Sequence, residues 1–163
     1  MFDKPETIDD LFEMQLKDLY ISESQLIDAL PLMAEKAKDG RLRAGFTRSL
    51  HETEMQLQRL ETIGEALGLD LDGYICKAMK GLIAEGQETM SERATEEVMD
   101  TALIAAQRIE HYEISDYGTA AHYAKRFGYT EVAELLRQTL NEEQLTDTKL
   151  NGLAKNYLNQ KAV

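Results

Sequence analysis

The stretch ALIAAQRIEHYEISDYGT, residues 102–119, decides the fold, because it combines the periodicity of a buried helix with acidic residues at core positions. Residues three or four apart share one face of an α-helix. One such stripe consists of Ala106, Glu110, Glu113, Tyr117, Ala120 and Ala124. Two glutamates therefore lie on a stripe that small and aromatic residues otherwise fill.

A second acidic stripe follows Gly128 and consists of Leu136, Leu140, Glu143, Asp147, Leu150 and Ala154. Like charges at these spacings repel each other, and burying an unpaired carboxylate costs several kcal/mol. No Lys or Arg lies on either stripe to offset the charge. We therefore interpret the pairs Glu110/Glu113 and Glu143/Asp147 as metal ligands rather than as solvated or protonated carboxylates.

Two further acids fall at the same height in a hairpin nearer the amino terminus. Glu113 lies fifteen residues before Gly128 and Glu143 fifteen after it, so an antiparallel pair places them at one level. Glu23 lies sixteen residues before Asp39, and Glu52 twelve after Gly40. The resulting mismatch is about 6 Å at about 1.5 Å per residue, which side chains can absorb. Four helices can thus present acids to one layer.

The rest of the chain also predicts helices. Apolar spacing and the cap Thr7 predict one helix from residue 8 to about 38, with a kink near Leu30 caused by Pro31. A second helix is predicted from the Asp39–Gly40 turn to residue 67, where Gly68 ends it. A short helix is expected over 74–90, and long helices over 96–126 and over 130–158, the last capped by Thr130. Two hairpins joined by nearly thirty residues predict an all-α, ferritin-like four-helix bundle with one long crossover that carries a short extra helix. We expect a single domain over residues 1–163.

Composition limits the partners. The formal net charge is -12, which disfavours nucleic acid and membrane surfaces as partners. The single cysteine, Cys76, cannot form an internal disulfide, and its apolar setting indicates a buried structural thiol. With no signal-like or membrane-spanning run, the expected location is the cytoplasm.

The histidines do not follow the usual di-iron pattern, in which Glu-x-x-His occurs on two helices. None of His51, His111 and His122 has a glutamate three residues before it. His111 is about 100° from Glu110 around the helix and is predicted on its flank. Tyr117, one turn after Glu113, is expected in the core, with its hydroxyl bonded to a carboxylate.

The quoted stretch, together with DLYISESQLIDALPLMA, HETEMQLQRLE, KAMKGLIAEG and LLRQTLNEEQLTDTKL, closely resembles the YciE/YciF family of bacterial stress-associated proteins over about residues 7–157. The resemblance implies a ferritin-like bundle, usually dimeric, with a di-metal centre, a link to stress responses and no established reaction. It assigns the metal ligands to Glu23, Glu52, Glu110, Glu113, Glu143 and Asp147. The ligand on the helix predicted from the Asp39–Gly40 turn to residue 67 stays open among Glu52, Glu54 and His51, and Glu142 is an alternative on the last long helix.

An all-carboxylate site admits Fe or Mn, and also Mg or Ca; two divalent ions, with iron first and manganese second, are expected. The leading hypothesis is a non-haem di-metal carboxylate protein that reacts with oxygen or peroxide, possessing an oxidative-stress or iron-related redox role. The alternative is a non-catalytic, dimeric stress or interaction protein with a degenerate or redox-silent metal site. Leu135 and Leu145 are the expected homodimer face.

Overall fold

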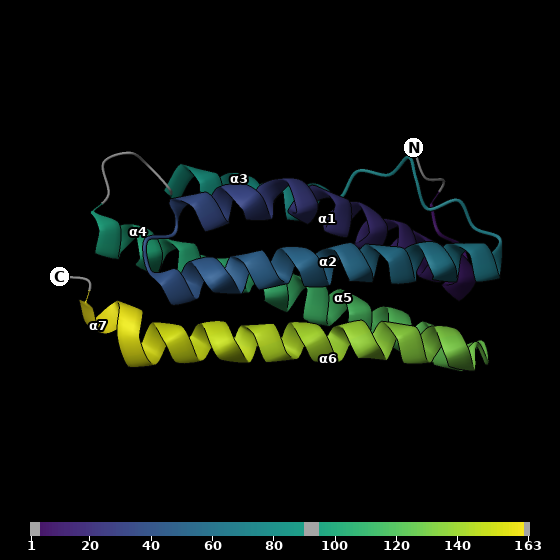
Figure 1. Ribbon diagram of the computed structural model, residues 1–163. Helices are drawn as coiled ribbons and strands as arrows, with labels where there is room; N and C mark the ends of the chain where they lie inside the picture. The colour runs from purple at the N-terminus through teal and green to yellow at the C-terminus, as the bar shows by residue number, and fades with distance from the viewer. Residues whose placement is uncertain (1–3, 90–94, 162–163) are drawn as a thin grey trace.

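The computed structural model describes residues 4–89 and 95–161, and over those ranges the regular structure is helical. Figure 1 shows the elements in chain order. They are α1 (Ile8–Lys36), α2 (Gly40–Leu67), α3 (Lys77–Thr89), α4 (Glu96–Leu103), a 3-10 turn (Ile104–Ala106), α5 (Gln107–Arg126), α6 (Thr130–Leu153), a π-helical turn (Ala154–Leu158) and α7 (Asn159–Lys161). The all-α prediction is confirmed. No described helix combines the length and the apolar character that crossing a bilayer requires.

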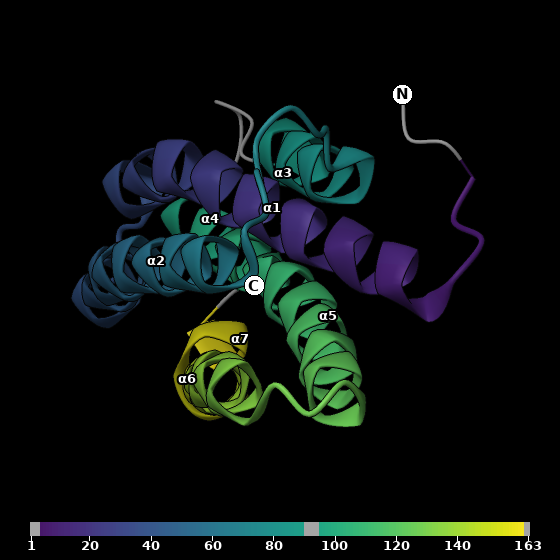
Figure 2. The ribbon, with the colours of Figure 1, turned by 90° about the vertical axis from the view of Figure 1, so that its right-hand side faces the viewer.

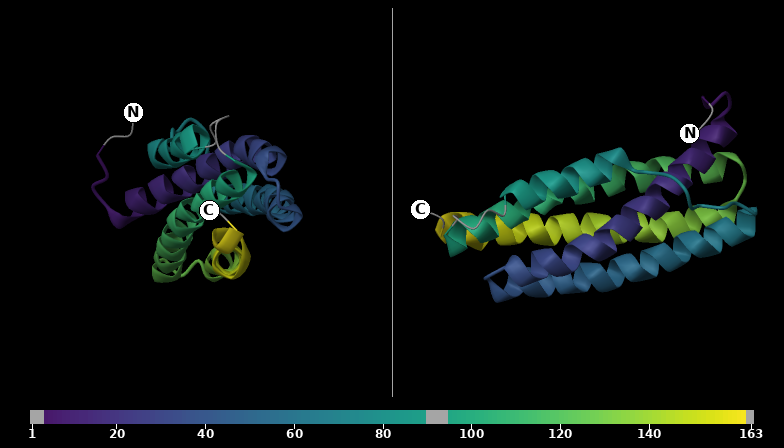
Figure 3. Two further views of the ribbon diagram at one scale, coloured as in Figure 1. Left: turned by 90° about the vertical axis from the view of Figure 1, so that its left-hand side faces the viewer. Right: turned by 90° about the horizontal axis from the view of Figure 1, so that it is seen from above.

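Four long helices form the bundle. α1 packs against α2 and α5, while α6 packs against α5 and α2. After α2 the chain returns along the bundle, and α3 lies on the outside against α1 and α5 (Figures 2 and 3). The predicted ferritin-like bundle, with a long crossover that carries an extra helix, is therefore confirmed.

Local signals in the sequence set most of the helix ends. Thr7 and Asp10 form the predicted capping box at the start of α1, and Gly68 ends α2 in the left-handed region with φ 68. Thr130 is not a cap: it is the first residue of α6, and the N-cap position falls on Tyr129 without a side-chain hydrogen bond. α1 runs through Pro31 to Lys36 as one helix, and the kink stays a prediction.

The two helices expected on either side of the crossover's end differ in detail. The helix expected over 74–90 begins at Lys77, and its expected end at Met90 lies outside the described residues. The helix expected over 96–126 is interrupted by the 3-10 turn at Ile104–Ala106. A 3-10 turn changes the hydrogen-bond pattern over a few residues only, so apolar periodicity does not reveal it.

Among the described residues, the core consists of two apolar clusters at opposite ends of the bundle. One contains Leu30, Phe46 and Leu150, and the other contains Leu16, Leu60, Leu136 and further residues. Between them, the bundle buries polar side chains: Glu23, Thr53, Gln56, Glu110, Glu113, Thr139 and Glu143. On each of the four long helices, polar residues thus interrupt the apolar stripe at the same level of the bundle.

The end of the first hairpin is tied to the crossover. Asp100 on α4 is buried and accepts hydrogen bonds from the backbone N–H groups of Lys38 and Asp39, both at 2.7 Å. Cys76, just before α3, is fully buried as predicted, and burial raises the pKa of its thiol. These contacts fix α3 and α4 against the bundle.

Candidate metal centre

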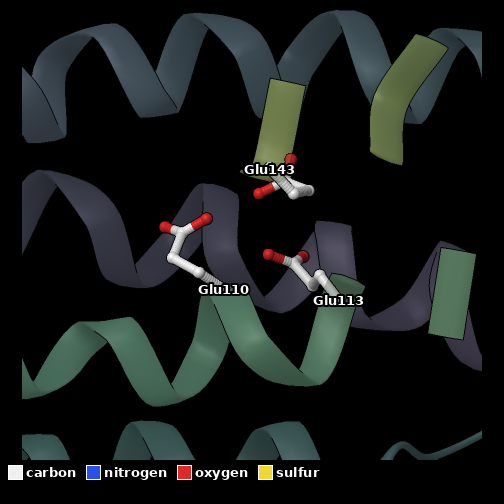
Figure 4. Close-up of side chains that lie close together, drawn as sticks. All are labelled: Glu110, Glu113 and Glu143. Carbon is white, nitrogen blue, oxygen red and sulfur yellow. The ribbon is translucent and has the colours of Figure 1, made fainter. Parts of the chain in front are cut away.

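Three glutamates of the polar layer converge at its centre. Glu110 and Glu113 come from α5 and Glu143 from α6, and Figure 4 shows their carboxylates directed toward one another. One carboxylate oxygen from each lies within 4.8 Å of those of the other two. Their relative exposures are 7%, 2% and 5%, so bulk water does not screen their charges. This arrangement is geometrically suited to binding a cation.

Glu23 joins this cluster from α1. Its side chain is fully buried, and the hydroxyl of Tyr117 donates a hydrogen bond of 2.5 Å to its Oε1. The prediction that Tyr117 lies in the core and bonds a carboxylate is therefore confirmed. Besides burial, repulsion from Glu143 raises the pKa of Glu23, and repulsion from Glu23 raises the pKa of Glu113. Glu23 thus belongs to the same electrostatic unit as the three converging glutamates.

The buried carboxylates are short of hydrogen-bond donors. Within the described part of the chain, Oε2 of Glu23, Oε2 of Glu110 and Oε1 of Glu113 are buried and have no hydrogen-bond partner. Burial is the main reason that the pKa of each of these three carboxyls is raised well above its ordinary value, and repulsion among the acids adds to it. Burial also raises the pKa of Glu143. Without a cation, the cluster must therefore hold protons to stay buried.

Two residues of α2 that sequence reasoning missed complete the layer. The buried Gln56 donates from Nε2 to Oε1 of Glu143 and, at 3.2 Å, to Oε2 of Glu142. Arg59 binds Glu142 through two parallel hydrogen bonds, of 2.6 and 2.7 Å. Glu142 is thus occupied by an arginine, which makes it a poor alternative ligand. Gln56 lies between the buried Thr53 and Leu60, and this spacing was the available signal.

The remaining predicted ligands lie at the edge of the cluster. Glu52 is half-buried and accepts a hydrogen bond of 3.4 Å from Thr146. Asp147 is half-buried and accepts a hydrogen bond of 2.9 Å from Gln107, with His111 Nε2 at 3.3 Å from the same oxygen. The structure thus brings Glu23, Glu110, Glu113 and Glu143 together and places the other two beside them.

The other residues considered on α2 point to solvent. The side chains of His51 and Glu54 are 73% and 51% exposed and lie 3.7 Å apart. Of the three open possibilities on this helix, Glu52 alone lines the cavity beside the glutamate cluster. His111 is exposed, as expected for a residue on the helix flank, although it reaches Asp147.

The glutamate cluster borders a small internal chamber with a cavity volume of about 20 Å³. Its lining is asymmetric. The polar part comes from four glutamates, of which Glu52 is half-buried, together with Ser49, Thr53 and Gln56. The apolar part comes mainly from Leu26, Leu30, Met33, Phe46 and Ile109. A small ligand can therefore meet both the carboxylates and an apolar wall in the same chamber.

A larger cleft, of about 820 Å³, lies elsewhere, between α1, α3 and α5. There Asp18 accepts hydrogen bonds from the hydroxyl of Tyr112 and, at 3.3 Å, from the thiol of Cys76. Burial and the neighbouring Asp18 raise the pKa of Asp116 to about 6. Asp18 in this cleft has donors, whereas three buried oxygens of the central cluster have none, so the central cluster is the stronger candidate for a cation.

The fold and the central cluster define a class: a ferritin-like helical bundle with a buried carboxylate centre. The chain belongs to the family described as Domain of unknown function (DUF892), whose model matches residues 7–163.

Relatives agree with this assignment over nearly the whole chain. Protein YciF of Escherichia coli (strain K12) is 43% identical over 158 residues, which are 96% of this chain and 95% of that protein. The crystal structure of the E. coli stress protein YciF superposes with a TM-score of 0.91 at 42% identity, covering 96% of this chain and all of that one. YcfI from Rhodopseudomonas palustris gives a TM-score of 0.87 at 40% identity, over 93% of this chain and 98% of that one.

Proposed function

We propose that this protein is a non-haem di-metal carboxylate protein with a redox role in the stress response. The single observation that carries the proposal is the set of buried carboxylate oxygens on Glu23, Glu110 and Glu113 that lack a hydrogen-bond donor. Buried charge requires a partner, and bound cations would supply one. The stress association is taken from the relative that is described as a stress protein.

Charge balance favours two divalent ions. Glu23, Glu110, Glu113 and Glu143 carry four negative charges when ionised, which two divalent cations neutralise. The donors are all carboxylate oxygens, which suit Mg, Ca and Mn and also admit ferrous iron. We propose iron first and manganese second, with Glu52 and Asp147 as further ligands from the edge of the cluster.

Ions held by Glu23, Glu110, Glu113 and Glu143 would supply the electrons for reducing dioxygen or peroxide. The chain's own residues prepare the site. Gln56 orients Glu143 through its amide N–H, and Tyr117 orients Glu23 through its hydroxyl. Arg59 pairs with Glu142, and its positive charge lowers the pKa of Glu23 while the charge of Glu142 raises it. The apolar wall keeps bulk water from the carboxylates.

Metal analysis tests this proposal. The wild-type protein, loaded with ferrous iron or manganese under anaerobic conditions and then desalted, should retain about two ions per chain, whereas Glu113→Gln combined with Glu143→Gln should retain almost none. Glu134→Gln is the matched control on α6, because Glu134 is exposed and pairs with Arg137. Equal metal content in the wild type and the double variant would exclude the site. Anomalous diffraction at the iron and manganese edges then identifies the ion.

A second candidate function follows from the donor set. The cluster of Glu110, Glu113 and Glu143 contains no imidazole, and a carboxylate-only centre can hold an ion that does not change its redox state. The protein would then be a non-catalytic stress or interaction protein. Iron-loaded protein that consumes neither dioxygen nor peroxide above background would favour this second function.

We also propose that the chain forms a homodimer in the cytoplasm. Leu145 on α6 is 53% exposed, which supports the predicted dimer face, while its companion Leu135 is half-buried against the core. Light scattering of the wild type and of Leu145→Glu should show a dimer and a monomer, respectively.

A further inference from the structure

A second small cavity lies next to the chamber of the glutamate cluster. It has a volume of about 40 Å³ and lies between α1, α3, α4 and α5. Its lining is predominantly apolar and includes Leu32, Met33, Leu82, Ile83, Leu103 and Ile109. This volume exceeds the roughly 10–15 Å³ that one water needs, so the cavity has room for a small molecule, and its apolar lining favours a dry cavity.

The exposure of the lining residues shows that this cavity runs inward from the surface. Leu32 is 48% exposed, whereas Leu103 is only 2% exposed. At the outer rim, Arg108 on α5 forms an ion pair of 2.8 Å with Glu85 on α3. The two charges cancel at the mouth, so the rim neither attracts nor repels a charged solute strongly.

The inner end of this cavity meets the chamber. Met33, Ala106 and Ile109 line both spaces and therefore form the wall between them. Ala106 ends the 3-10 turn, so the break in the helix places a small side chain at the wall. Met33 has an unbranched side chain with three rotatable bonds, which can move aside more easily than a β-branched one.

We infer that this cavity is the entry and holding site for dioxygen on its way to the carboxylate chamber; the inference rests on the proposed function above. Dioxygen has no hydrogen bonds to lose on entering an apolar cavity. Hydrogen peroxide loses its hydrogen bonds to water on entering such a cavity, and burying a polar group without a hydrogen-bond partner costs about 2–7 kcal/mol of free energy. Peroxide instead fits the polar side of the chamber, which Ser49, Glu52 and Thr53 line.

α3 offers a matched pair of variants for the test. Gly86 lines the cavity, whereas Gly81, one and a half turns earlier on the same helix, is exposed and does not. A Cβ atom added at either glycine meets nothing within 4 Å. Replacing either glycine in the helix also improves helix propensity by a similar amount. Gly86→Phe should therefore fill the cavity, and Gly81→Phe is its control.

Xenon tests the cavity independently of any metal. Crystals of the metal-free wild type and of Gly81→Phe, pressurised with xenon, should show an anomalous peak among Leu82, Ile83 and Ile109, and crystals of Gly86→Phe should not. A wild-type cavity that takes no xenon overturns the inference. If the protein binds no metal, the proposed function fails, while the xenon result still decides whether this cavity takes small apolar molecules.

Reaction rates test the route in iron-loaded protein. Stopped-flow measurements should show that Gly86→Phe slows the reaction with dioxygen about tenfold relative to Gly81→Phe, which corresponds to about 1.4 kcal/mol. The reaction with hydrogen peroxide should be equal in the two variants. Equal dioxygen rates would overturn the route, and so would a matching loss of the peroxide reaction.

Discussion

Replacing Glu113 by Gln should stabilise the metal-free protein at neutral pH, because the amide removes a buried group that otherwise has to hold a proton. At a separation of 4.8 Å, each ionised pair among Glu110, Glu113 and Glu143 would repel by about 3.5 kcal/mol at an effective dielectric constant of about 20. Three such pairs amount to about 10 kcal/mol, which is comparable with the whole stability of a domain. Without a cation the folded state must therefore keep protons on this cluster.

The cost of those protons sets the size and the pH dependence of the effect. Burial raises the pKa of Glu113 above 4.5 in the folded state, so between pH 4.5 and the raised value the folded protein binds more protons than the unfolded chain. The contribution of Glu113 to the stability of the metal-free wild type is thus greatest below pH 4.5 and falls as the pH rises toward its raised pKa. Glu113→Gln should gain nothing at pH 4.5 and at most about 4 kcal/mol at pH 7.5, at about 1.4 kcal/mol per unit.

Thermal denaturation of chelator-treated protein from pH 5 to pH 8 measures this effect. For a chain of this size, about 4 kcal/mol raises the Tm by about 8–16 °C. Adding a divalent ion at about 100 times its Kd should stabilise the wild type by about 2.7 kcal/mol and Glu113→Gln much less. Glu134→Gln, with an exposed side chain, should follow the wild type throughout. A metal-free Glu113→Gln with the wild-type Tm and pH slope would refute the reasoning.

Three further variants probe two groups beside the cluster and one at the α1–α2 connection. Arg59→Leu breaks the paired hydrogen bonds to Glu142 and should lower the free energy of unfolding by about 3 kcal/mol, or the Tm by about 6–12 °C, as measured by calorimetry. Arg59→Lys should lie between this variant and the wild type, and an unchanged Tm would contradict the prediction. Tyr117→Phe removes the donor to Glu23 and should weaken metal binding about 10–100-fold in a calorimetric titration, whereas unchanged affinity would mean that Glu23 is not a ligand. Asp100→Ala should cost about 1–3 kcal/mol and speed amide hydrogen exchange at the α1–α2 connection, and wild-type exchange there would rule out the anchoring role.

The buried acids of α5 and α6 were predictable because the spacing of residues within each helix reveals their position. Glu110 and Glu113 share their stripe with the buried Tyr117, Ala120 and Ala124. Glu143 shares its stripe with the buried Leu136, Leu150 and Ala154. An acid at a core position contradicts its apolar neighbours, and that contradiction is visible in one sequence. The equal distances of Glu113 and Glu143 from Gly128 then placed them at one level in the hairpin.

The contribution of α2 was not predictable in the same way. Leu50 and Leu57 are only half-buried, while the buried stripe passes through Thr53 and Gln56. The role of a polar residue on such a stripe cannot be predicted from the spacing, because its hydrogen-bond partner lies on another helix. The contact between Gln56 and Glu143 depends on how α2 is rotated against α6. The spacing of residues along α2 does not predict that rotation.

The amino-acid sequence also does not predict that the chamber has a polar side and an apolar wall. Its polar side comes from α2 with Ser49 and Glu52, and its apolar wall comes from α1 and the 3-10 turn with Met33 and Ala106. The crossover creates the difference, because α3 covers the side of α1 and α5 that would otherwise face water and leaves a narrow apolar space there. A simple four-helix bundle without the crossover would expose that side. The extra helix thus shields the carboxylates from water while leaving space for a small apolar molecule to reach them.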